Sequence, residues 1–244
     1  PRRRDGLAGE SAQGARVAEA LAYLRRNWAV FLPVYAGFAV ATIHTYALGN
    51  WGATFLIRSF NRSAVEVGNW LGAGALVAGA AGALLGGFLN DRVSRSGRPE
   101  RKFLLLMILC VCILPSTLEV LAPSFEVGIA MVVLSVFVMP MLGTTMISTL
   151  TEMMPGNMRG FGISLMGLSN TLLGQTVGPL AVAKATEQLY GSPGMVGASL
   201  TTVGVPVILI GMGLYGLALR GMWRRRAVDP AFDEIVARTY GRAA

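Results

Sequence analysis

Histidine, cysteine and charged residues are scarce in this sequence of 244 residues, and each scarcity excludes a class of function. The single histidine, His44, and the two cysteines, Cys110 and Cys112, provide neither a paired-histidine motif nor a four-ligand metal site. No nucleophile elbow and no phosphate-binding glycine loop is found either. We therefore expect no catalytic site, no cofactor and no metal.

Charged residues make up only 14% of the chain, against about a quarter in an average soluble domain. Hydrophobic residues make up 53%, and they lie in long runs separated by short charged stretches. A chain of this kind has too little polar surface to remain dissolved in water. The composition therefore predicts an integral membrane protein.

Six apolar runs are each long enough to cross roughly 30 Å of hydrocarbon as a helix. Loops rich in basic residues alternate along the chain with loops that have few, as expected when successive helices cross in opposite directions. The fold class predicted is an all-α membrane protein with six transmembrane helices. The runs are Trp28 to Leu56, Val65 to Leu89, Phe103 to Leu121, Val127 to Leu150, Phe161 to Ala183 and Met195 to Met222.

The formal net charge is +8, which would suggest nucleic acid as a partner if the chain were a soluble domain. The basic residues, however, lie beside the apolar runs, without interleaved aromatic residues, so we expect contact with anionic lipid and no nucleic acid. Eighteen of the 21 Arg and Lys residues fall on one side of the predicted bundle, whereas Arg58 and Arg62 fall on the other. This bias predicts that both termini lie in the cytoplasm. The membrane we expect is the bacterial inner membrane.

Three regions are predicted: a cytoplasmic segment 1–27, a six-helix bundle 28–223 and a cytoplasmic tail 224–244. In the first region Val17, Leu21, Leu24 and Trp28 share a helical face, which favours an interfacial helix, although a basic linker fits equally well. In the tail, Phe232 to Arg238 could form a helix capped by Asp229. The chain begins with proline and has no signal-peptide pattern, so we expect upstream sequence to be missing.

Polar residues inside the first apolar run mark a candidate pathway for a solute, because in hydrocarbon they must face a partner or a watery cavity. Thr42, Tyr46 and Asn50 recur every four residues and share one helical face. His44 and Trp51 lie seven residues apart on a second face. His44 could carry a proton or bind a ligand, and packing against a neighbouring helix is an equally good interpretation.

Two later runs carry polar residues of the same kind. Thr144, Ser148 and Thr151 repeat the pattern in the fourth run, and Asn170 and Gln175 lie in the fifth. For each Ser or Thr singly, a hydrogen bond back to its own helix is the more common arrangement. We nevertheless predict that the first and fourth helices line the pathway.

Glycines and one acidic residue indicate where helices meet. Gly174 and Gly178 are four residues apart, and Gly86 and Gly87 precede a charged turn, spacings that favour close helix packing. Asp91 ends the second apolar run in the stretch GGFLNDRVSRSGRPERK. A carboxylate at the membrane surface can pair with a base or with a helix N-terminus and so hold two bundles together, whereas a surface charge cluster would explain only the arginines.

The same stretch resembles the loop motif of the major facilitator superfamily, in which an aspartate and a base follow glycine and a later glycine and arginine complete the motif. TEMMPGNMRGFG is similar to that family's stretch between its tenth and eleventh helices, and GQTVGP resembles its glycine-proline motif. YLRRNWAVFLPVYAGFA followed by YALGNWGATFLIRSF looks most like the Spinster-like branch. The resemblance covers Leu21 to about Arg226.

This resemblance implies helices seven to twelve of the family, arranged as two inverted three-helix repeats. Asp91, Arg92, Glu152 and Arg159 would then form a cytoplasmic gate. The expected function is transport of a small amphiphilic or organic solute by alternating access, coupled to protons. The expected partners are a missing N-terminal six-helix half, a small or lipid-like substrate and membrane lipids. A proton-coupled organic anion symporter of the same superfamily and a scaffold or receptor subunit without transport activity are the alternatives.

Overall fold

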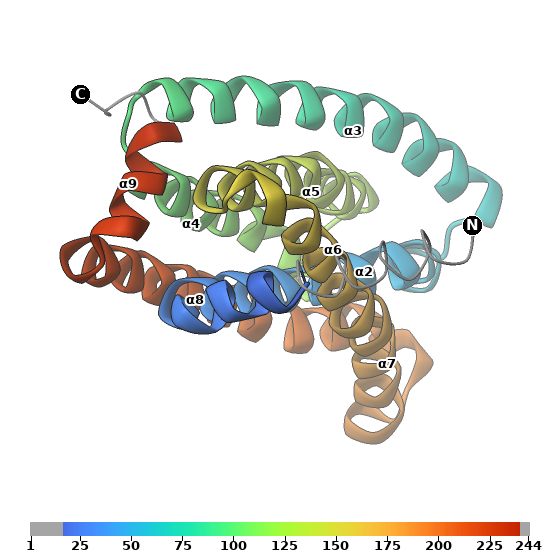
Figure 1. Ribbon diagram of the computed structural model, residues 1–244. Helices are drawn as coiled ribbons and strands as arrows, with labels where there is room; N and C mark the ends of the chain where they lie inside the picture. The colour runs from blue at the N-terminus through green and yellow to red at the C-terminus, as the bar shows by residue number, and fades with distance from the viewer. Residues whose placement is uncertain (1–16, 240–244) are drawn as a thin grey trace, which may run out of the picture.

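The computed structural model describes residues 17–239, and every regular element in this range is a helix (Figure 1). The interfacial helix predicted from Val17 to Trp28 lies within this range, and residues 17–26 are helical. The other elements are α2 (Trp28–Phe60), α3 (Ala64–Arg95), α4 (Glu100–Ile113), η1 (Leu114–Thr117), η2 (Glu119–Leu121), α5 (Phe125–Met153), η3 (Gly156–Met158), α6 (Arg159–Ser169), η4 (Asn170–Gln175), α7 (Thr176–Lys184), η5 (Ala185–Tyr190), η6 (Pro193–Met195), α8 (Val196–Val228) and α9 (Pro230–Thr239).

The expected all-helical membrane fold is confirmed, and each of the six apolar runs coincides with helical structure. Within residues 17–239, four helices are long and apolar enough to cross a membrane: α2, α3, α5 and the helix that contains α8. The third run is shorter because α4 passes into 3₁₀ helix at Leu114, just before Pro115. The fifth run is divided into α6, the π-helical η4, α7 and the π-helical η5.

In each of the two most closely packed helix pairs, a glycine lets the two helices approach each other. A Cβ atom at Gly221 would lie 2.0 Å from the carbonyl oxygen of Ala29, where α8 crosses α2. A Cβ atom at Gly82 would lie 2.0 Å from the carbonyl oxygen of Phe137, where α3 crosses α5. Such contacts between backbones take the place of the hydrophobic effect, which is weak between helices that are already in lipid.

Short turns with specific end structures connect the first long helices. The Ser63 hydroxyl accepts a hydrogen bond from the backbone N–H of Glu66 and so caps α3. Asn61, immediately before, adopts the left-handed conformation with φ 50°, which ends α2. The side chain of Ser124 caps α5 in the same way as Ser63 caps α3.

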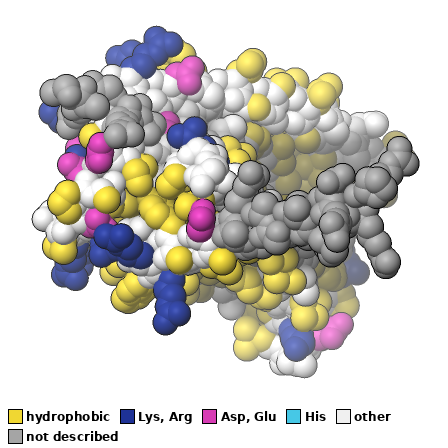
Figure 2. Space-filling model, viewed as in Figure 1, with side chains coloured by type: hydrophobic (Ala, Val, Ile, Leu, Met, Phe, Trp, Pro, Cys, Tyr) yellow, Lys and Arg dark blue, Asp and Glu magenta, His cyan; other side chains and the backbone are white. Residues whose placement is uncertain are grey.

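The loop after α3 and the C-terminal end of α8 lie at the same end of the bundle. Arg226 at the end of α8 lies 3.9 Å from Glu100 at the start of α4, and Arg26 lies 3.0 Å from Asp229. Figure 2 shows basic side chains gathered at the end of the molecule where α8 meets α9. Arg26, near the first described residues, and Asp229, just before α9, therefore lie at the same end of the bundle.

The tail forms the helix α9, and α9 packs onto this end of the bundle. Phe232 and Val236 are each 1% exposed and share a core with Leu24. Leu24 is the buried member of the apolar face predicted for residues 17–28, whereas Val17, Leu21 and Trp28 are 37%, 51% and 63% exposed. Residues 17–26 therefore rest on the protein through only part of that face.

Tyr23 fixes this short helix to the end of α5. Its hydroxyl donates a hydrogen bond of 2.8 Å to the carbonyl oxygen of Met153. Burial, assisted by the nearby Asp229 carboxylate, raises the pKa of Tyr23 above its ordinary value, so the hydroxyl remains a donor.

Candidate transport pathway and gate

The predicted polar face of α2 meets the π-helical segment η4. The hydroxyl of Tyr46 accepts a hydrogen bond of 3.0 Å from the side-chain amide of Asn170. Thr42 is fully buried, and its hydroxyl donates to the carbonyl oxygen of Ala39 in its own helix. Tyr46 and Asn170, which are 124 residues apart in sequence, therefore form the one side-chain hydrogen bond that we find between α2 and η4 in the described chain.

Glycine makes this contact possible. A Cβ atom at Gly174 would lie 2.7 Å from Thr42 Oγ1 and 2.8 Å from the ring of Tyr46. A Cβ atom at Gly178 would lie 2.5 Å from the carbonyl oxygen of Ile43. The fifth span thus touches α2 along its two closely spaced glycines, and any larger residue would push the two helices apart.

The side chains at the edge of this contact are more exposed. The amide of Asn50 donates to the carbonyl oxygen of Tyr46 in its own helix, an arrangement expected from the sequence for Ser and Thr but not for Asn50. Gln175 is exposed on η4. Trp51 is partly buried, and its indole N–H donates a hydrogen bond of 3.0 Å to the carbonyl oxygen of Pro179.

A π-helix in this position widens one turn of the fifth span. The segment is Asn170–Gln175, and the side-chain hydroxyl of Thr176, just after it, donates a hydrogen bond of 3.3 Å to the carbonyl oxygen of Thr171. Short π-helical segments inside α-helices are frequent at functional sites. No local pattern in the sequence indicated this interruption, which lies where Gly174 and Asn170 contact α2.

His44 points to a different part of the bundle from Tyr46. It is fully buried, and its Nε2 lies 3.2 Å from the hydroxyl of Ser116 in η1. Its Nδ1 has no hydrogen-bond partner in the described chain and faces Gly204 of α8. His44 therefore belongs to a polar contact between α2, η1 and α8.

Glu119 in η2 is a second buried polar residue, at the end of the bundle formed by η1 and η2. It was not predicted as a site residue. It is 1% exposed, and one of its carboxyl oxygens accepts a weak hydrogen bond of 3.4 Å from Thr201. Within residues 17–239 no basic side chain lies within 4.0 Å of it. In the sequence, the only indication that Glu119 could be a site residue was its position as a lone glutamate in an apolar run.

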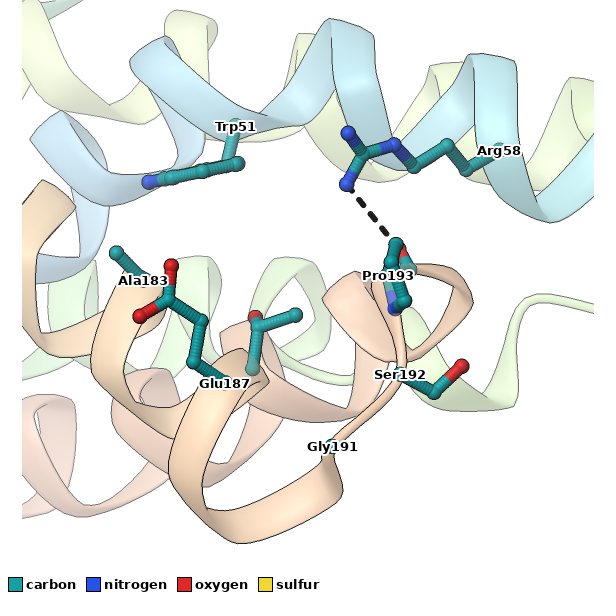
Figure 3. Close-up of a pocket in the computed structure, with 8 residues that line it drawn as sticks. Trp51, Arg58, Ala183, Glu187, Gly191, Ser192 and Pro193 are labelled. Atoms are coloured by element: carbon teal, nitrogen blue, oxygen red, sulfur yellow. Dashed lines mark hydrogen bonds between the residues drawn. The ribbon is translucent and has the colours of Figure 1, made fainter.

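A pocket opens beside α2 at the same end of the molecule (Figure 3). It has a volume of about 390 Å³, and Trp51, Arg58 and Glu187 contribute to its lining. Arg58 donates a hydrogen bond of 3.2 Å to the carbonyl oxygen of Pro193, as Figure 3 shows. This bond ties α2 to the turn before α8.

Thr144 and Ser148 of the fourth span face α3 and α4. Thr144 Oγ1 would lie 2.8 Å from a Cβ atom at Gly86 and accepts a hydrogen bond from Asn90. Ser148 accepts a hydrogen bond of 2.6 Å from Lys102. Both residues therefore contribute to a polar cluster between three helices. Gly87, next to Gly86, has nothing within 4 Å of its Cβ position and faces open space.

Lys102 and Glu152 form the centre of this cluster, which we call the Lys102 cluster. Lys102 is 1% exposed, and its Nζ lies 3.1 Å from Glu152 Oε1. Ser94 and Ser148 each donate a hydrogen bond of 2.8 Å to the same carboxylate oxygen, and Asn90 accepts from Lys102. Glu152 belongs to the predicted gate, whereas Lys102, Asn90 and Ser94 were not predicted as site residues, although Asn90 and Ser94 are four residues apart.

The other predicted gate residues lie on the surface at the same end. Asp91 and Arg92 are exposed, and together with Arg95 and Arg101 they line a depression of about 360 Å³. In the described chain Asp91 has no ion pair within 4.0 Å. Arg159, also exposed, donates to the carbonyl oxygen of Met154.

The helix lengths and the arrangement of the polar residues define a multi-pass membrane protein. The family model of the Major Facilitator Superfamily matches residues 1–179. The chain therefore belongs to the major facilitator superfamily.

Two solved structures have a similar fold, and both are of a bacterial homolog to the human lysosomal transporter Spinster. The inward-facing occupied form gives a TM-score of 0.53 at 18% identity and covers 86% of this chain and 49% of that chain. The inward-facing unoccupied form gives a TM-score of 0.56 at 17% identity and covers 91% of this chain and 50% of that chain. The chain thus spans about half the length of these proteins. No curated protein matches the sequence.

Proposed function

We propose that this chain forms the C-terminal half of a secondary transporter of the Spinster-like branch, which moves a small amphiphilic or lipid-like solute by alternating access. A second six-helix half would complete the pathway. The contact between Tyr46 and Asn170 is the observation that carries the proposal. It places a hydrogen-bonded polar pair beside a π-helical segment, with Asn50 and Gln175 exposed nearby.

Exposed surfaces of two helices support the proposed second half. The most hydrophobic stretch of α3 is only 17% buried, and Leu76, Val77 and Leu84 are 70% to 77% exposed. In the fifth span Leu172 is 58% exposed. By resemblance to the family these two helices lie at the seam between halves, where such faces would be covered.

Two buried polar groups, each with one atom that lacks a hydrogen bond in the described chain, support proton coupling. Glu119 lacks a basic partner in the described chain, and Nδ1 of His44 has no hydrogen bond there. In an apolar setting such groups are places where a proton can be taken up and released. We propose that Glu119 and His44 take part in this proton exchange.

Flux in proteoliposomes tests the proposal. The 244-residue chain and a version extended by its upstream coding sequence would be reconstituted with a fluorescent lysophospholipid and an imposed pH gradient. We expect gradient-dependent flux only from the extended version. Substitution of Glu119→Gln should abolish its dependence on the pH gradient, whereas Glu126→Gln, at an exposed helix start, should not. Flux from the chain alone would refute the requirement for a second half, and gradient-independent flux would refute proton coupling.

A further inference from the structure

A groove runs between α2 and α8 at the end of the bundle where the basic side chains gather. It has a volume of about 580 Å³. Its floor is made of small residues, because Gly221 brings the backbone of α8 against Ala29. Its walls are Trp28 and Leu32 on one side and Leu214 and Leu217 on the other.

The walls are apolar and open to the surroundings. Trp28, Leu32 and Leu217 are 63%, 58% and 53% exposed. In a membrane protein such surfaces face lipid, and a groove of this width between two helices can take an acyl chain. Trp28 also has the ring type that collects at the level of the lipid headgroups.

Two arginines stand at the charged end of the groove. Arg220 and Arg224 lie one turn apart on α8 and contribute to its lining. Both are exposed, and neither has a hydrogen bond or an ion pair within the described chain. No acidic residue lines the groove.

The next two arginines of the same helix behave differently. Arg225 donates to Asn27 and lies 3.5 Å from Asp229, and Arg226 pairs with Asp233 and Glu100. Of the four arginines near the end of α8, Arg225 and Arg226 therefore form contacts within the protein, whereas Arg220 and Arg224 line the groove. Guanidinium groups without protein partners beside an apolar groove complement a phosphate group that carries acyl chains.

We propose that this groove binds one anionic phospholipid of the cytoplasmic leaflet. Its phosphate contacts Arg220 and Arg224, and one acyl chain lies between Leu32 and Leu217. Basic pockets between membrane helices on the cytoplasmic side bind anionic headgroups by the same combination of charge and apolar contact. The site is separate from the polar contact of α2 with η4 and does not depend on which solute is transported.

Lipid binding to the full 244-residue chain tests the site. The chain would be purified in a neutral detergent and titrated with phosphatidylglycerol, phosphatidylcholine or inorganic phosphate, with bound lipid counted by native mass spectrometry. We expect one phosphatidylglycerol to bind and the double variant Arg220→Gln, Arg224→Gln to bind it at least about tenfold more weakly. The matched control is Arg95→Gln, Arg101→Gln, which removes the same charge from exposed sites at the same end.

Each further result has a defined meaning. Equal loss in the control variant would show general attraction to anionic lipid and overturn the proposal. Equal binding of phosphatidylcholine, or occupation by inorganic phosphate at similar concentration, would also overturn it. Quenching of Trp28 by brominated phosphatidylglycerol provides a second measurement: quenching should fall in Trp28→Phe, and an unchanged signal would place the lipid elsewhere.

Discussion

Lys102 at the start of α4 and Glu152 at the end of α5 form an ion pair, with 3.1 Å between Nζ and Oε1. Lys102 is 1% exposed, so its ammonium group has almost no contact with solvent and depends on Glu152, Ser148 and Asn90. Removal of one partner from such a pair leaves a buried charge without compensation, which costs more than the pair itself contributes. The Lys102 cluster therefore holds α3, α4 and α5 together at the charged end.

Glu152→Ala is expected to destabilise the protein by about 3 to 5 kcal/mol, because Lys102 would remain buried without its counter-charge. The double variant Lys102→Met, Glu152→Leu should recover most of this loss, since no charge remains. Thermal unfolding in detergent measures both. A double variant as unstable as Glu152→Ala would contradict this account of the pair.

Gly82→Ala is expected to weaken the packing of α3 on α5 by about 1 to 3 kcal/mol, the usual cost of overpacking. The new Cβ would lie 2.0 Å from a backbone oxygen that cannot rotate away. Gly87→Ala on the same helix is the control, because nothing lies within 4 Å of its Cβ position. Unfolding in denaturant distinguishes them, and equal stability of the two variants would show that α3 does not pack on α5 through Gly82.

Tyr46→Phe should cost about 1 to 3 kcal/mol, because the amide of Asn170 would lose its acceptor. In the extended transporter we also expect slower flux, since this contact positions η4 beside α2. Tyr190→Phe provides a control, because it removes a tyrosine hydroxyl whose hydrogen bond with Thr202 is exposed to the surroundings. Unchanged stability and flux in Tyr46→Phe would remove this contact from the pathway.

Asp91→Asn should reduce flux through the extended transporter without a large change in stability, because Asp91 is exposed and unpaired in the described chain. A gate that holds two bundles together requires the partner of Asp91 to belong to the proposed second half, so the variant should matter only when that half is present. Thermal unfolding of the 244-residue chain provides the reference. A stability loss in that chain alone would assign Asp91 a structural role within this half.

Phe232→Ala should release α9 from the bundle, because its ring is 1% exposed and removal of a buried phenyl group costs about 3 to 5 kcal/mol. Hydrogen exchange of residues 230–239 should then become faster, while exchange in α2 and α8 stays unchanged. Ala231→Ser, at an exposed position beside it, is the control. Faster exchange throughout the bundle would mean that α9 is not a separate unit.

The sequence by itself determined that the chain lies in a membrane, how many apolar runs it has and on which side of the bundle the charges gather. These features depend on composition and on short-range periodicity. It also indicated that Gly174 and Gly178 could accept a close neighbour. Only the tertiary structure decided which helix that neighbour is, where the fifth span becomes π-helical, and that Lys102 is the buried partner of Glu152. Those features depend on contacts between residues far apart in sequence, such as Tyr46 and Asn170, and no local pattern in the chain encodes such a pairing.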